Sequence, residues 1–222
     1  MIFLPVAFPL ILVLLVLVLV VLVVLIELRI LAYAYRKIGV KPRYVFAIMV
    51  LTIIGSHVNI PLYAIPATRV SSAREVWMFG QPYVVEGVTR GMTVVAINVG
   101  GALIPALLSL YLFVRSGMYV RMAIGILIVS VIVHRLAYVV PGVGIAVPML
   151  VPPLAAAGVA LLLAFRRAPP LAYVSGTMGA LIGADLTNLG KVAQLGAPVV
   201  SIGGAGTFDG VFLTGIIAGL LA

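Results

Sequence analysis

The sequence predicts an all-α, polytopic membrane protein that folds as a single transmembrane helical domain over residues 1–222. Hydrophobic residues make up 64% of the chain and charged residues 9%, whereas soluble domains average about 45–50% and about 25%. The apolar residues also come in long runs that are separated by short basic segments. A run of about 20 apolar residues crosses the hydrocarbon core of a bilayer as a helix. Composition and run length therefore indicate a helical bundle in a membrane.

Seven apolar runs have the length of a spanning helix. The first, residues 1–26, lacks the basic start and the small-residue cleavage site of a signal peptide, so we expect it to stay in the membrane. The other six predicted spans are residues 44–65, 91–114, 122–140, 148–165, 171–189 and 199–221.

The longest polar segment, residues 66–90, separates the second span from the third. It is predicted to be an extracytoplasmic loop. Trp77 and Tyr83 suit a cap that lies at the membrane interface, and a plain solvated loop on the headgroups is an equal alternative.

The basic residues predict a plasma-membrane protein with its N-terminus outside and its C-terminus in the cytoplasm, because inner loops carry the excess of Lys and Arg. In this orientation the inner segments hold Arg29, Arg36, Lys37, Lys41, Arg43, Arg115, Arg121, Arg166 and Arg167, and the outer segments hold Arg69, Arg74, Arg90 and Lys191. The net charge of +9 is therefore assigned to anionic lipid headgroups, and no nucleic acid is expected as a partner.

Two pairs of predicted spans share short signatures. "IGSHVNIP" at 54–61 resembles "IGADLTNLG" at 182–190, and "NVGGALIP" at 98–105 resembles "SIGGAGTF" at 201–208. The order of the signatures predicts a parallel internal repeat that relates the second and third spans to the sixth and seventh. Glycine-interrupted segments at matching places of two halves point to a binding site in transporters.

The same segments carry a family resemblance. "GSHVNIPL", "NVGGALIP", "GADLTNL" and "SIGGAGTFDGVFLTGIIA" resemble the signatures of a prokaryotic membrane-protein family catalogued as domain of unknown function 1614. The resemblance covers four of the predicted spans and over half of the chain. It implies a multi-pass membrane protein and no particular activity. The scarcity of Asn, Gln and Cys is, in addition, typical of a heat-adapted source.

Several ionisable residues fall inside the predicted spans. They are Asp185, Asp209, His57, His134 and Arg135. A charged group at the bilayer centre costs about 2.5–3.5 kcal/mol on insertion scales, so such residues face a bundle interior or a water-filled cavity. His134 lies outside the repeat and is interpreted as a packing or interfacial residue. We expect no cofactor and no metal site, because no close pair of histidines has metal-ligand spacing.

The first functional hypothesis is a carrier or channel for a proton, a cation or a small polar solute. In this hypothesis Asp185 and Asp209 bind the substrate, Arg135 opposes their protonation, and further contacts come from Asn188, His57, Asn59 and Asn98. The glycines beside Asp209 either let a neighbouring helix cross closely or expose backbone groups to a cavity.

The second hypothesis is an intramembrane aspartyl protease. Asp185 and Asp209 occur on consecutive predicted spans, which is similar to the presenilin and signal-peptide-peptidase group, and two neighbouring carboxylates can activate water. The motif "GTFD" departs from the Gly-x-Gly-Asp of that group. A lipid-binding or assembly scaffold is the third hypothesis.

Overall fold

The computed structural model describes residues 7–78, 81–140, 144–195, 197–204 and 210–222, and it is mostly helical. Its α-helices are α1 (Ala7–Lys37), α2 (Pro42–Gly55), α3 (Ile104–Ser116), α4 (Tyr119–Leu136), α5 (Val151–Ala164), α6 (Ala168–Ala180) and α7 (Gly210–Leu221). Short π and 3-10 helices are η1 (Val99–Leu103), η2 (Phe165–Arg167), η3 (Leu181–Asp185) and η4 (Leu186–Gln194). The strands are β1 (Asn59–Met78), β2 (Gln81–Asn98), β3 (Tyr138–Val140), β4 (Gly144–Ala146) and β5 (Val199–Ile202).

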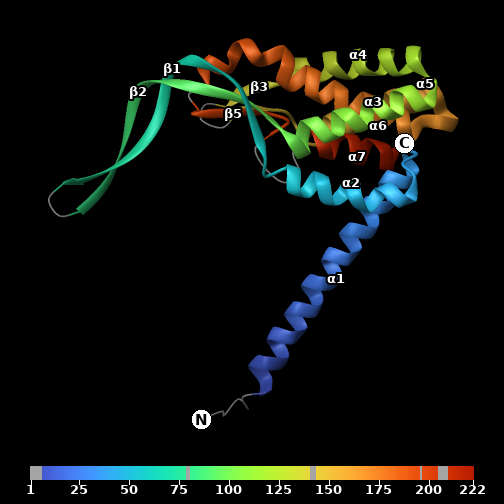
Figure 1. Ribbon diagram of the computed structural model, residues 1–222, viewed down its shortest axis with the longest axis horizontal. Coiled ribbons are helices and arrows are strands. Elements are labelled where there is room, and N and C mark those ends of the chain that lie inside the picture. The colour runs from blue at the N-terminus through green and yellow to red at the C-terminus, as the bar shows by residue number, and fades with distance from the viewer. Residues whose placement is uncertain (1–6, 79–80, 141–143, 196, 205–209) are drawn as a thin grey trace.

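Helices α2 to α7 form one bundle, from which α1 and the β1–β2 hairpin project in different directions (Figure 1). Helix α6 lies at the bundle centre and packs against α3, α4, α5 and α7. Its residues from Leu171 to Thr177 are buried on every side. A helix that is buried all round belongs to the interior of its protein.

Small residues bring the helices together. A Cβ atom at Gly125 of α4 would lie 3.0 Å from the Ser175 Cβ of α6, and one at Gly215 of α7 would lie 3.0 Å from a ring carbon of Tyr173. In a bilayer, close packing of this kind holds helices together, because lipid tails are as apolar as the helices themselves.

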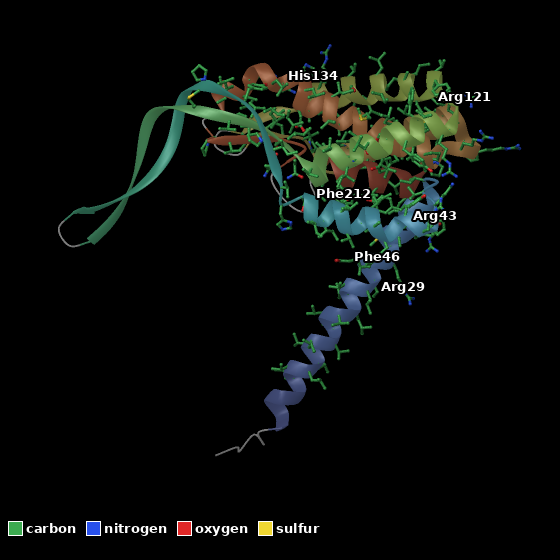
Figure 2. The ribbon with its side chains drawn as sticks, viewed as in Figure 1. Arg29, Arg43, Phe46, Arg121, His134 and Phe212 are labelled. Atoms are coloured by element: carbon green, nitrogen blue, oxygen red, sulfur yellow. The ribbon has the colours of Figure 1, made fainter. Side chains whose placement is uncertain are left out.

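One end of the bundle, here called the basic end, collects the turns between α1 and α2, α3 and α4, and α5 and α6, together with the C-terminus. The Lys37 Nζ donates a hydrogen bond of 2.7 Å to the Leu220 carbonyl there. Figure 2 shows Arg43 and Arg121 at this end, with His134 toward the other end of α4. Apart from Arg29, which lies within α1, the basic residues assigned to the cytoplasm therefore flank turns that share one end.

Four helical segments of the described residues are long and apolar enough to cross a membrane: Leu12–Lys37, Val99–Ser116, Tyr119–Leu136 and Val151–Ala193. Within the last of these, η2 lets α5 and α6 fold against each other. Two shorter apolar helices are Pro42–Gly55 and Gly210–Leu221. The chain is thus a membrane protein, whereas the count of seven spans, the inserted orientation and the repeat remain predictions.

The prediction of an all-α chain is wrong for the segment between α2 and α3. Helix α2 ends at Gly55 rather than at residue 65, and the π-helical turn before α3 begins at Val99 rather than at residue 91. The predicted loop at 66–90 belongs to an antiparallel hairpin that pairs Asn59 with Asn98 at its base. The apolar segments on either side of this loop are long enough for helices that cross a membrane, but their Val, Ile, Tyr and Thr residues also favour strands.

Other predicted boundaries also shift. Helix α4 ends at Leu136, and residues 138–140 form β3, which pairs with β4. The start of the predicted seventh span forms β5 rather than helix. In contrast, α1 continues to Lys37, well past the predicted end at residue 26.

Candidate functional site at the strand end of the bundle

The strand end, opposite the basic end, brings two glycine-rich turns into contact. Strand β5 runs parallel to β2 and pairs Ile202 with Ile97. Each strand leads through two glycines toward a helix, α3 after β2 and α7 after β5. Gly101 packs against the Gly203 carbonyl so closely that no Cβ atom fits between them. The two related signatures of the sequence therefore meet directly.

Asn98 organises this crossing. Its side chain is fully buried, and its Oδ1 accepts a hydrogen bond of 2.7 Å from the Gly101 amide, which caps the helical segment that follows. Its Nδ2 donates to the Ser56 carbonyl at 2.7 Å and to the Asn59 Oδ1 at 3.0 Å. The Ser201 Oγ donates to the same Asn59 oxygen at 2.6 Å. One polar network thus joins α2, the hairpin base and β5.

Asp185 ends the π-helical turn that follows α6. Its half-buried carboxylate accepts a hydrogen bond of 2.7 Å from the Gly203 amide. Asp185 lines two cavities of about 310 Å³ and about 360 Å³, the first shared with Ser201 and Gly204 and the second with Thr214 and Gly210. The structure therefore places a carboxylate between the Asn98 network and the start of α7.

Asn188 and His134 stabilise the chain beyond Asp185. The buried Asn188 donates to the Ala184 carbonyl at 2.9 Å and accepts from the Lys191 Nζ at 2.7 Å. The Thr187 hydroxyl donates to the Gly183 carbonyl at 2.8 Å, so it accepts from the His134 Nδ1, which lies 2.8 Å away. The exposed His134 thus joins α4 to η4.

Two further predicted residues, His57 and Arg135, are exposed. His57 is exposed in the turn after α2, with its Nδ1 3.0 Å from the Ile53 carbonyl of that helix. Arg135 is exposed in the last turn of α4, and the described hydrogen bond to the Asp185 carboxylate comes from Gly203. Asp209 lies outside the described residues.

Sequence reasoning missed two participants of this site, Ser56 and Ser201, and one acid elsewhere in the chain, Glu27. Ser56 and Ser201 contribute to the Asn98 network, but an isolated serine in an apolar run gives no signal of its own. Glu27 was placed just beyond the first predicted span, although it lies inside α1 and inside the spanning candidate Leu12–Lys37. The apolar residues that continue after Arg29 could have indicated that the first helix extends beyond residue 26.

The comparisons with known proteins concern most of this architecture. The model of a family described as "Protein of unknown function (DUF1614)" matches residues 53–221. The chain belongs to this family. The matched range begins near the end of α2 and contains the whole strand end, whereas α1 of this DUF1614 chain precedes it. No curated protein and no solved structure matches the chain.

Proposed function

We propose that the chain is a small carrier or channel and that the strand end binds a proton, a cation or a small polar solute beside Asp185. The observation that carries the proposal is the position of this carboxylate, which lines two cavities beside two glycine-rich breaks in the chain. In transporters, discontinuous helices expose backbone groups that bind substrate and coupling ions. A carboxylate in such a place attracts a cation and repels an anion.

The Asn98 network supports the proposal in a different way. Buried polar groups in a membrane protein require partners, and here the buried Asn98 donates to Asn59, which also accepts from Ser201, so that the network joins three strands. The network therefore holds the turn before α3 and the strand β5 together beside the cavities. A movement of α7, whose Val211 and Thr214 line the larger cavity, would change the space around Asp185.

The sequence hypothesis adds Asp209 as a second carboxylate. Gly210, the next residue along the chain, lines the cavity of about 360 Å³ together with Asp185. This neighbour relation supports keeping Asp209 in the proposed site, with Asn188, His57 and Arg135 as outer residues. It also favours the intramembrane aspartyl protease as the second candidate function, because that chemistry needs two acids beside one water.

Flux measurements on the purified protein in liposomes test the proposal. We expect the parent protein to dissipate an imposed gradient of protons, Na⁺ or K⁺, and Asp185→Asn to abolish this flux because an amide carries no charge. Asp185→Glu, which keeps the charge, should retain part of the flux. Arg167→Gln, at the opposite end of the bundle, serves as the control for folding and incorporation.

Three results would contradict transport at Asp185. Undiminished flux in Asp185→Asn would place the conducting site elsewhere. Cleavage of a helical peptide by the parent, lost in Asp185→Asn and unaccompanied by flux, would establish the protease. A parent with neither activity would favour the lipid-binding or assembly scaffold.

A further inference from the structure

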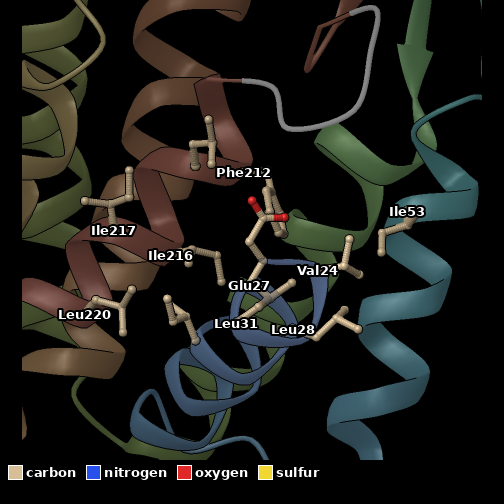
Figure 3. Close-up of a pocket in the computed structure, with 11 residues that line it drawn as sticks. Val24, Glu27, Leu28, Leu31, Ile53, Phe212, Ile216, Ile217 and Leu220 are labelled. Carbon is tan, nitrogen blue, oxygen red and sulfur yellow. The ribbon is translucent and has the colours of Figure 1, made fainter. Parts of the chain in front are cut away.

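A second carboxylate faces a cleft on the lateral surface of the bundle. The cleft has a volume of about 470 Å³ and lies between α1 on one side and α2 and α7 on the other. Its walls are aliphatic or aromatic and include Val24, Leu28, Ile53, Phe212 and Ile216, and among the described residues Glu27 is its one ionisable lining residue. Figure 3 shows the Glu27 carboxylate pointing into the cleft toward Phe212. The volume is within the range of ligand pockets, about 300–1,000 Å³.

Glu27 lies well away from the ends of the bundle. Glu27 precedes Lys37, which lies at the basic end, by 10 residues of α1, so it is about 15 Å from that end along the helix at about 1.5 Å per residue. An ionisable group at such a depth is expensive unless it has a function or a partner. Within the described part of the chain, no hydrogen bond or salt bridge engages the Glu27 carboxylate.

The shape of the cleft shows how a ligand would enter. Helix α1 packs on the bundle through its C-terminal turns, where Ala34 and Tyr35 are buried, and it diverges from the bundle toward its N-terminus (Figure 1). Residues 12–30 of α1 are exposed and almost entirely apolar. The cleft therefore opens toward the surroundings of the bundle, which are lipid for a membrane protein.

We propose that this cleft binds a cationic amphiphile, a long-chain amine whose ammonium group pairs with Glu27 and whose alkyl chain lies against the apolar walls. The charge of Glu27 decides the class of ligand, because a single carboxylate attracts cationic amphiphiles and repels anionic ones. A hard metal ion requires about six oxygen ligands, and the side chains of the described lining residues supply none besides this carboxylate. The proposal does not rest on transport at Asp185, since the described lining residues of the two sites do not overlap.

Fluorescence quenching tests the proposal with the full chain in phosphatidylcholine vesicles. The chain has one tryptophan, so Trp77→Phe gives a dark background and Ile53→Trp reports from the α2 wall of the cleft. The probes are a long-chain primary amine with a brominated chain and the alcohol of the same chain. We expect the amine to quench at a concentration lower by about tenfold or more, the effect of a charge-assisted hydrogen bond.

Variants of Glu27 test the contribution of the carboxylate to binding separately from that of the apolar walls. Glu27→Gln should remove the preference for the amine, and Glu27→Asp should keep it. Arg29→Gln, on the same helix outside the cleft lining, should keep it as well. Val24→Trp provides a second reporter from the α1 wall, in case tryptophan at position 53 fills the space. Equal quenching by amine and alcohol, or an unchanged preference in Glu27→Gln, would overturn the proposal.

A second copy of the chain is the competing occupant. The chain contains no cysteine, so Leu28→Cys introduces a single thiol at the cleft. Efficient disulfide formation between two copies in the vesicles would show that a neighbouring helix fills the cleft, and this result would also overturn the proposal. A monomeric Leu28→Cys protein that retains the amine preference supports it.

Discussion

The backbone amide of Gly203 donates a hydrogen bond of 2.7 Å to the Asp185 carboxylate, across 18 positions of the sequence. This contact joins the turn after α6 to the turn before α7. Gly203 has a φ of +81°, a left-handed conformation that costs a residue with a side chain about 1–2 kcal/mol. The position of the carboxylate therefore depends on a glycine.

Gly203→Ala should destabilise the protein and displace Asp185. Besides the strained φ, the new Cβ would lie 2.6 Å from the Ala102 amide nitrogen, so the two turns would have to separate. We expect a lower midpoint of thermal unfolding in detergent, together with reduced flux. Gly190→Ala is the matched control, because no heavy atom lies within 4 Å of its Cβ position. A Gly203→Ala protein as stable as the Gly190→Ala protein would contradict this account.

Asn98→Ala should remove a helix cap and the centre of the polar network. The loss leaves the Gly101 amide without its cap and the Ser56 carbonyl without its side-chain donor. Unsatisfied buried groups cost about 1–3 kcal/mol each, so thermal unfolding should occur at a clearly lower temperature. Asn59→Ala, at an exposed position, should cost less. A double-mutant cycle measures the coupling of the two, and strictly additive losses would show that their 3.0 Å hydrogen bond contributes nothing.

Gly215→Ala should loosen the crossing of α6 and α7. A methyl group at this position would press on the Thr177 hydroxyl and lie 3.0 Å from the Tyr173 ring. Gly158→Ala in α5 has open space around its Cβ position and should stabilise its helix by about 0.5–1 kcal/mol. Relative to the parent, we therefore expect a lower midpoint of thermal unfolding for Gly215→Ala and a higher one for Gly158→Ala. A stabilising Gly215→Ala would mean that the crossing is looser than described.

Labelling of single cysteines in intact cells tests the orientation. Ser72 lies in β1 of the hairpin, and Ser116 ends α3 at the basic end. If the basic end faces the cytoplasm, Ser72→Cys should react with an impermeant maleimide added outside. Ser116→Cys should react only after the membrane is opened. The opposite pattern would invert the predicted topology.

The sequence predicted several features that local chemistry controls. Long apolar runs, few charges and basic turns indicated a helical membrane protein, and the glycine signatures indicated the family to which the chain belongs. Asp185 was selected because an acid is expensive in an apolar run wherever that run folds. The composition of the chain, and the free energy of placing an acid in an apolar segment, do not depend on which segments become neighbours in the fold.

The hairpin could not be predicted from these criteria. Apolar residues flank the polar segment at 66–90, and an apolar run of limited length is compatible with either a helix or a strand. The choice depends on partners: strand β2 pairs with β1 and also with β5, which lies about a hundred residues further along the chain. Backbone hydrogen bonds between distant segments are a property of the tertiary structure.

Tertiary structure also decided the surroundings of the polar residues that the structure describes in and beside the apolar segments. Asn98 became a buried cap, His57 stayed exposed, and Glu27 came to face an apolar cleft. The sequence by itself determined that these side chains occur in or beside apolar segments, where polar groups need partners. Which partner each one finds depends on the crossing of helices and turns far apart in the chain, because hydrogen bonds and close packing act only over a few ångströms.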